Sequence, residues 1–109
     1  MAGQKTISVT YTPPPPPPPI ADYHVVGTIT PDSRGNYFAA GFNDGQPYYR
    51  RDDSLYFVWF STFSSNWYIS TNVGQYVNPR WRSQYFDIEG TYFPEAGSSG
   101  NATVVLGPE

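Results

Sequence analysis

A run of seven consecutive prolines divides this chain and limits how it can fold. The run consists of Pro13, Pro14, Pro15, Pro16, Pro17, Pro18 and Pro19. Proline has a fixed φ angle and no backbone N–H group, so such a run can neither pair within a sheet nor continue a helix. The sequence therefore predicts a stiff polyproline II rod about 22 Å long, since each residue adds about 3.1 Å.

The rod divides the chain into three parts. Residues 1–12 form a head, residues 13–20 form the stalk, and residues 21–109 form a body of the size of one small domain. The layout is typical of an anchor, a spacer and a displayed module.

The head has the alternation of a β-strand. Ile7, Val9 and Tyr11 fall on one side of residues 6–12, and serine and threonine residues fall on the other. A lone strand ahead of a rod has no partner nearby in its own chain, so we expect it to add to the sheet edge of another protein. The alternative is an N-terminal arm that is disordered in the isolated protein. The two interpretations are compatible if the arm becomes ordered only when the protein assembles with its partner.

The composition favours aromatic side chains as the source of stability. Aromatic residues make up 18% of the chain and charged residues only 14%, and cysteine is absent. Disulfides and thiolate metal sites are therefore excluded. The net charge of −3 gives no sign of a nucleic-acid or anionic membrane partner. The first twenty residues hold no continuous apolar segment, which predicts synthesis without a signal peptide.

Turn-forming residues separate short runs of β-branched and aromatic residues throughout the body. The expected strands are residues 23–30, 37–42, 46–51, 55–61, 67–71, 84–93 and 102–106. The residues Asn43-Asp44-Gly45 predict a tight hairpin. The fold class predicted is all-β, a small antiparallel sandwich or barrel of six or seven short strands behind the arm and stalk.

The segment 55–61 is apolar on both faces, with the side chains of Phe57 and Trp59 on one face and those of Val58 and Phe60 on the other. Both faces need cover, either from two layers of one domain or from another subunit. Together with the small size of the body, this predicts a homo-oligomer, and a trimer is favoured. Trp59 and Trp67 are expected to be buried.

The polar residues do not form a recognisable catalytic pattern. His24 is the only histidine, which disfavours histidine-based nucleophilic catalysis and a zinc site. The carboxylates at Asp52-Asp53, Asp87 and Glu89 are better explained as turn caps and a solvated strand face than as a glycosidase pair. The prediction is no enzyme, no cofactor and no metal.

One cluster is a candidate ligand site. Arg80, Trp81, Arg82 and Tyr85 could form a stacking platform for a sugar ring or a base. The alternative, which we prefer, places Trp81 in the core with the two arginines shielding it.

A series of turn residues and aromatic residues runs from residue 27 to residue 105. It comprises Gly27, Pro31, Asp32, Gly35, Tyr37, Gly41, Asn43, Gly45, Gln46, Pro47, Tyr48, Tyr49, Arg50, Tyr56, Trp59, Trp67, Ile69, Ser70, Gly74, Trp81, Gly90, Tyr92, Pro94, Gly97, Gly100, Ala102 and Val104. This pattern resembles a small aromatic-rich β module of virion surface proteins from tailed phages and environmental viruses. The resemblance covers about three quarters of the chain and brings no catalytic residue.

The resemblance implies a virion structural protein of the capsid-decoration, head-fibre or tail-fibre type. The arm would then dock on other virion proteins, and the module would be displayed at the virion surface after synthesis in the host cytoplasm. The alternative is a carbohydrate-binding adhesin that uses exposed Trp and Tyr to contact a host-surface glycan. A stand-alone enzyme ranks third.

Overall fold

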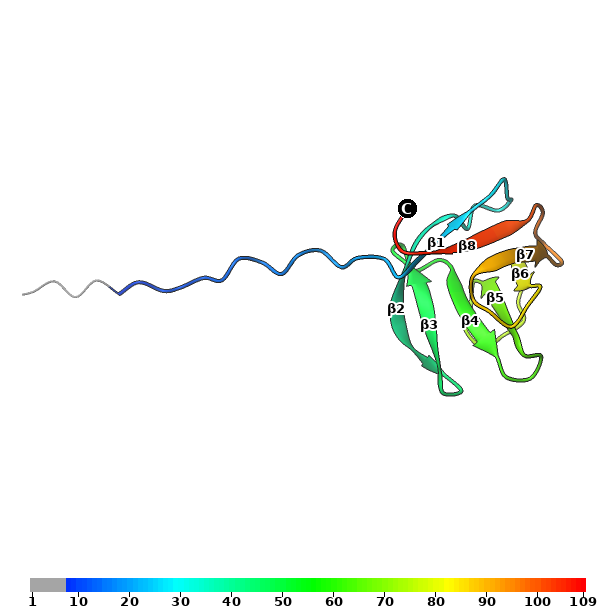
Figure 1. The fold of residues 1–109 in the computed structure, drawn as a ribbon, viewed down its shortest axis with the longest axis horizontal. Helices are drawn as coiled ribbons and strands as arrows, with labels where there is room; N and C mark the ends of the chain where they lie inside the picture. The colour runs from blue at the N-terminus through cyan, green and yellow to red at the C-terminus, as the bar shows by residue number, and fades with distance from the viewer. Residues whose placement is uncertain (1–7) are drawn as a thin grey trace, which may run out of the picture.

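The computed structural model describes residues 8–109, which form a closed antiparallel β-barrel behind an extended N-terminal segment (Figure 1). The strands are β1 (Tyr23–Val26), β2 (Gly35–Asn43), β3 (Gln46–Arg51), β4 (Phe57–Ser61), β5 (Asn66–Ser70), β6 (Arg80–Ser83), β7 (Gly90–Pro94) and β8 (Ala102–Leu106). Each strand pairs with the next along the chain, and β8 pairs with β1. This is an up-and-down barrel. Residues 8–109 include no helix long and apolar enough to cross a membrane.

The all-β antiparallel prediction is confirmed, but the predicted count of six or seven strands is wrong, because the barrel has eight. The ladder between β1 and β8 closes the sheet, so the sandwich alternative does not apply. The sequence pattern missed β6 because this strand has four residues, of which only Trp81 is apolar. The strand expected over residues 84–93 begins only at Gly90, and residues 84–89 form a loop.

Side chains fill the interior of the barrel. Its core consists of Val25, Ile29, Tyr37, Tyr56, Val58, Phe60, Trp67, Ile69, Trp81, Tyr92, Ala102 and Val104. An eight-stranded barrel has an interior just wide enough for side chains or for one small ligand, and here aromatic side chains occupy that space. The expected burial of Trp67 in the core is confirmed.

Two local features define the ends of the barrel. Asp44 and Gly45 have φ angles of 50° and 77° and join β2 to β3, which confirms the predicted tight hairpin. At the opposite end, Thr30 and Ser99 exchange backbone hydrogen bonds of 3.1 and 2.8 Å, which tie the β1–β2 connection to the β7–β8 connection.

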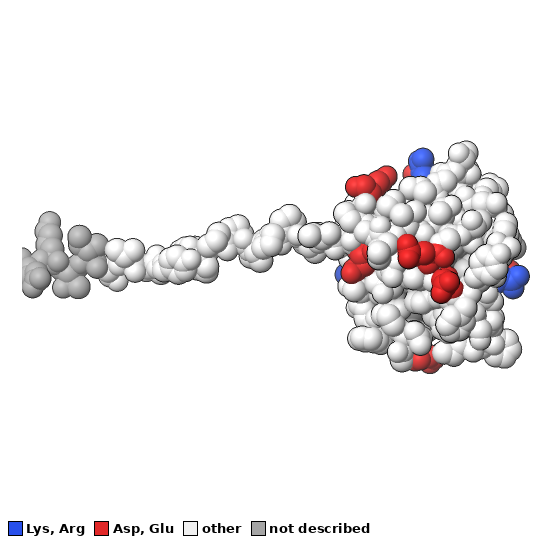
Figure 2. Space-filling view, viewed as in Figure 1, with Lys and Arg blue, Asp and Glu red and all other residues white. Residues whose placement is uncertain are grey.

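The segment from residue 8 to residue 20 extends away from the barrel and belongs to no strand (Figure 1). Every residue in it is exposed, whereas Ala21, the next residue, is buried. Figure 2 shows that the segment carries no charged side chain. Of the residues expected to form the anchor, Val9 and Tyr11 are exposed, and Ile7 lies outside the described residues.

Candidate functional site

A row of four outward side chains crosses the wall of the barrel from β4 to β7. The inward residues of these strands alternate with outward ones. The outward members are cross-strand neighbours, with Trp59 opposite Tyr68, Tyr68 opposite Arg82, and Arg82 opposite Phe93. We call this set of four residues the outer row.

The β4–β5 half of the outer row is covered by the chain itself. The rings of Trp59 and Tyr68 stack with their centroids 5.2 Å apart, and the ring of Tyr76 lies 5.7 Å from Trp59 and 5.3 Å from Tyr68. Tyr76 belongs to the β5–β6 connection. The cover leaves Trp59 only 2% exposed, although it lies outside the barrel core. The two-faced apolar strand predicted at residues 55–61 is therefore covered on its outer face by a loop of the same chain.

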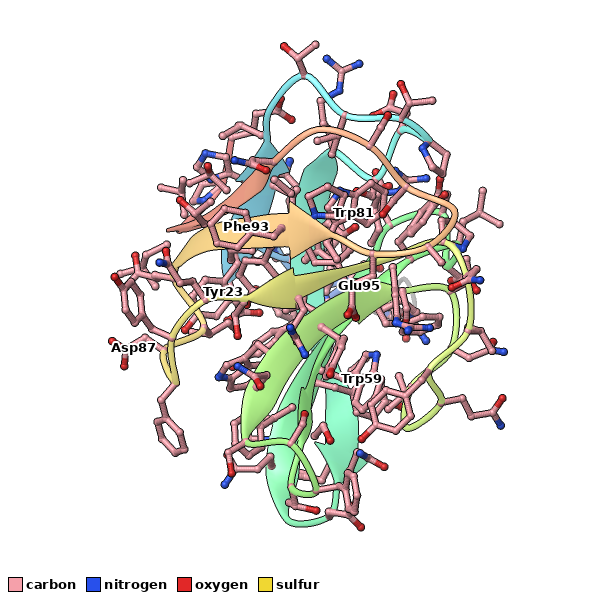
Figure 3. The ribbon with its side chains drawn as sticks, turned by 90° about the vertical axis from the view of Figure 1, so that its right-hand side faces the viewer. Tyr23, Trp59, Trp81, Asp87, Phe93 and Glu95 are labelled. Carbon is pink, nitrogen blue, oxygen red and sulfur yellow. The ribbon has the colours of Figure 1, made fainter. Side chains whose placement is uncertain are left out.

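The β6–β7 half of the outer row is open. It borders a groove of about 450 Å³. The groove is lined by Asn66, Arg82, Ser83, Gln84, Phe93, Pro94 and Glu95. Figure 3 looks onto the side of the body opposite the stalk and shows Phe93 and Glu95 on that side. We call this feature the distal groove.

One rim of the distal groove is fixed by a charged pair. The Arg80 Nε group donates a hydrogen bond of 2.8 Å to Glu95 Oε1. Arg80 Nη1 in turn donates to the carbonyl oxygen of Tyr76 at 2.7 Å and to Asn78 Oδ1 at 3.1 Å. Arg80 therefore fixes the Glu95 carboxylate and connects the groove to the loop that covers Trp59.

The groove also presents polar atoms without partners among the described residues. Glu95 Oε2 lies 3.9 Å from Arg82 Nη1, which is too long for a hydrogen bond. The Arg82 side chain is 51% exposed. Asn66 donates through Nδ2 to the carbonyl oxygen of Ser83 at 3.1 Å, and its Oδ1 accepts no hydrogen bond from the described residues. The groove thus combines N–H donors with oxygen acceptors.

The four residues predicted from the sequence to bind a ligand do not form one site in the structure. Trp81 is fully buried in the barrel core, where its Nε1 group donates to the carbonyl oxygen of Gly100 at 3.0 Å. It offers no face to a ligand, so the stacking platform suggested at this residue is wrong and the core alternative holds. Arg82 lines the distal groove, Arg80 supports its rim, and Tyr85 is exposed without lining it.

The sequence reading missed Phe93, Asn66 and Glu95 as groove residues. Phe93 was expected at the end of one long strand over 84–93, and Asn66 and Glu95 lay outside every expected strand. The cross-strand register places Tyr68 and Phe93 on the two sides of Arg82, and Asn66 joins them in the groove lining. This register is a tertiary property, and in the sequence only the alternation of Arg82 with Trp81 indicated that Arg82 faces outward.

Three of the other polar candidates have structural partners. His24 Nδ1 lies 2.9 Å from the carbonyl oxygen of Gly107. Glu89 Oε1 accepts a hydrogen bond of 3.1 Å from the backbone N–H of Leu106. Asp53 accepts two hydrogen bonds from Arg51, at 2.9 and 2.7 Å. Within residues 8–109, no three His, Cys, Asp or Glu side chains form a metal-binding group.

A second groove, of about 370 Å³, lies between the β2–β3 and β4–β5 hairpins. Its lining includes Asn43, Asp44, Thr62, Phe63, Gly74 and Tyr76. Thr62 Oγ1 donates to Asp44 Oδ2 at 3.2 Å and joins the two hairpins. The Phe63 ring beside it is 93% exposed.

Comparison with known proteins found no family model, no curated protein and no solved structure that matches this chain.

Proposed function

We propose that the protein is a virion structural protein of the decoration or head-fibre type, in which the arm at residues 1–12 docks on other virion proteins. Residues 13–20 then hold the barrel away from the particle surface. The observation that carries this proposal is the exposed, uncharged, extended segment that ends where the packed barrel begins at Ala21.

The chemistry of this segment suits a spacer. A polyproline rod has no internal hydrogen bonds to break and keeps its length in water. The resemblance of the body's residue pattern to virion surface modules gives the setting. The packed interior agrees with a rigid displayed body, since function on such a barrel must lie on its outer wall or loops.

We propose further that the displayed form is a homotrimer, because threefold clusters suit a projecting decoration or fibre. The β2–β3, β4–β5 and β6–β7 connections share one end of the barrel, since the strands alternate in direction. Exposed aromatic side chains lie at this end: Phe42, Phe63, Tyr85 and Phe86. Exposed apolar groups that cluster on one face are typical of an interface.

Sedimentation measures this directly. We expect the full chain to sediment as a trimer at micromolar concentration, and the double substitution Phe42→Ser and Phe63→Ser to shift it towards monomer. A chain that is monomeric both in solution and on the particle would refute the trimer while leaving the arm's role open.

The display proposal is tested by imaging the particle that carries the protein. The expected image shows barrel-sized densities that stand off the surface by about 22 Å, the length of the rod. Replacing the seven prolines with glycine and serine should keep the protein on the particle and blur these densities. Barrels packed flat against the shell would contradict the proposal.

A further inference from the structure

We infer that the distal groove is a binding site for neutral saccharides, with the exposed ring of Phe93 as its platform and Arg82, Glu95 and Asn66 at its edges. This inference goes beyond display, because it concerns recognition by the barrel and does not depend on where the arm is anchored.

The outer row supplies the first part of the argument. Its four members form one continuous strip across β4 to β7, of which half is covered and half is open. Over the covered half, the planar ring of Tyr76 packs on Trp59 and Tyr68. The open half places Arg82 opposite Phe93, no aromatic ring of the described residues packs on Phe93, and the Phe93 side chain is 41% exposed. A pyranose ring has apolar C–H faces and polar edges, so it can occupy such a platform.

The polar atoms around Phe93 decide the class of ligand. Arg82 offers N–H donors, while Glu95 Oε2 and Asn66 Oδ1 offer acceptors. A sugar hydroxyl both donates and accepts, so a saccharide can satisfy both kinds. A sulfate or carboxylate group on a ligand can only accept hydrogen bonds, and its negative charge would be repelled by the Glu95 carboxylate. The groove therefore favours neutral sugars over acidic ones.

The site is also held in place before any ligand arrives. Arg82 and Phe93 lie opposite each other in the β6–β7 ladder, and Glu95 is held by Arg80 at 2.8 Å. A preformed site loses less conformational entropy on binding than a mobile one. The groove volume of about 450 Å³ falls within the range of small-ligand sites, about 300–1,000 Å³.

The test uses the full chain and two panels of oligosaccharides. One panel is neutral, built from glucose, galactose, mannose and N-acetylglucosamine units, and the other is acidic, with sialylated, sulfated and uronic-acid-containing members. Binding is followed on arrays and by amide chemical-shift changes. We expect at least one neutral oligosaccharide to bind and to shift the amide signals of residues in β6 and β7.

Three variants locate the site. Phe93→Ala removes the platform, and Glu95→Gln removes the charged acceptor while keeping the shape of the side chain. Each should weaken binding by about tenfold or more. Leu55→Ala is the control, because it truncates an exposed apolar side chain that lies outside the groove and outside the aromatic end proposed for the trimer. The affinity of this variant for the saccharide should stay within about twofold of that of the parent.

Amide spectra of the variants establish that each has folded. Because Glu95 also pairs with Arg80, Phe93→Ala decides the outcome if Glu95→Gln alters the fold. Absence of binding to every neutral oligosaccharide would overturn the inference. So would a preference for the acidic panel, or equal affinity in the parent and Phe93→Ala.

Discussion

At the scale of single residues, Gly100 shows how closely the connections of this barrel pack. Its φ angle is +78°, and a Cβ atom at this position would overlap with the carbonyl oxygen of Thr28. The carbonyl oxygen of Gly100 also accepts the hydrogen bond from Trp81 Nε1. Gly45 provides a comparison, because it has nearly the same φ angle, +77°, with no atom near the position of a Cβ.

The pair separates backbone strain from steric overlap. We expect Gly45→Ala to lower the free energy of unfolding by about 1–2 kcal/mol, the cost of the left-handed conformation for an alanine. Gly100→Ala should cost a further 1–3 kcal/mol, roughly, because the backbone must also move. Denaturant unfolding of both variants measures the difference between their free energies of unfolding. Equal losses of stability would show that the backbone of the β7–β8 connection can move to accommodate the Cβ atom without an energetic cost.

A second residue-scale feature is the clamp made by Arg51. Its guanidinium group donates to the carbonyl oxygens of Asp32 and Arg34 at 2.6 and 3.0 Å, and it makes a two-bond pair with Asp53. The hydrogen bonds from Arg51 lower the pKa of the Asp53 carboxyl group below its ordinary value of 3.8. The clamp therefore joins the β1–β2 connection to the β3–β4 turn.

The lowered pKa makes this contribution pH-dependent. The folded protein keeps Asp53 ionised where the unfolded chain takes up a proton, so the stabilisation is present above pH 3.8 and is lost as the pH falls towards the lower folded pKa. Asp53→Asn should reduce stability near neutral pH and should flatten the acid side of the stability profile.

Asp52→Asn is the control for Asp53→Asn, since Asp52 makes no ion pair with the described residues. Its profile should follow that of the parent. The clamp would be refuted as a source of acid sensitivity if the Asp53→Asn profile kept the same slope as the parent below pH 3.8.

At the scale of elements, the β5–β6 connection acts as a cover for β4 and β5. Tyr76 packs on Trp59 and Tyr68, and its hydroxyl group is hydrogen-bonded to Ser61 Oγ. Trp59 Nε1 donates to Ser70 Oγ at 2.8 Å, and that hydroxyl donates to the carbonyl oxygen of Asn72 in the same connection. The loop thus completes a small aromatic cluster outside the barrel.

This arrangement predicts a local effect of removing the cover. Tyr76→Ala should expose Trp59, shift tryptophan emission to longer wavelength and lower stability by about 1–2 kcal/mol, less than a fully buried ring because Tyr76 is partly exposed. Tyr76→Phe should keep the emission and cost about 1 kcal/mol or less for the lost hydroxyl contact. Unchanged emission in Tyr76→Ala would contradict the covering role, since Trp67 and Trp81 lie in the barrel interior.

The strands that the sequence predicted well are those with clear local signals. The bounds expected for β3 and β8 agree with the structure. The strand β3 starts directly after the turn at Gly45 and contains two adjacent tyrosines, and β8 contains three β-branched residues and ends just before Gly107. The strand β6 was missed since its one inward aromatic residue lies between two arginines. Its role depends on pairing with β5 and β7, which local pattern does not encode.

The composition of the distal groove could not be predicted from local sequence pattern either. Arg80 and Arg82 were identified as candidates because they flank Trp81 in the sequence, but the groove also takes Asn66 from β5 and Phe93 from β7. These residues meet only through the barrel register. The loop that covers Trp59 was likewise not predicted, because the apolar outer face indicated either a second layer of the same domain or another subunit.

At the scale of the whole molecule, the chain combines a packed body with an extended segment at residues 8–20. The buried aromatic residues of the barrel lie in its interior and in the cluster under Tyr76. The conformation of the stalk is set by proline and not by packing against the body, since every residue of the stalk is exposed. We therefore expect the parts to act separately: the arm attaches the protein, the stalk spaces it from the particle, and the body is displayed.

The most direct test of this account is removal of residues 1–12 with the rod and barrel intact. The truncated chain should give the same thermal unfolding transition as the full chain, because the eight strands of the described barrel all lie between Tyr23 and Leu106. The amount bound per purified particle is then measured for both chains. The account predicts that the truncated chain folds normally and is absent from particles; incorporation at the level of the full chain would contradict it.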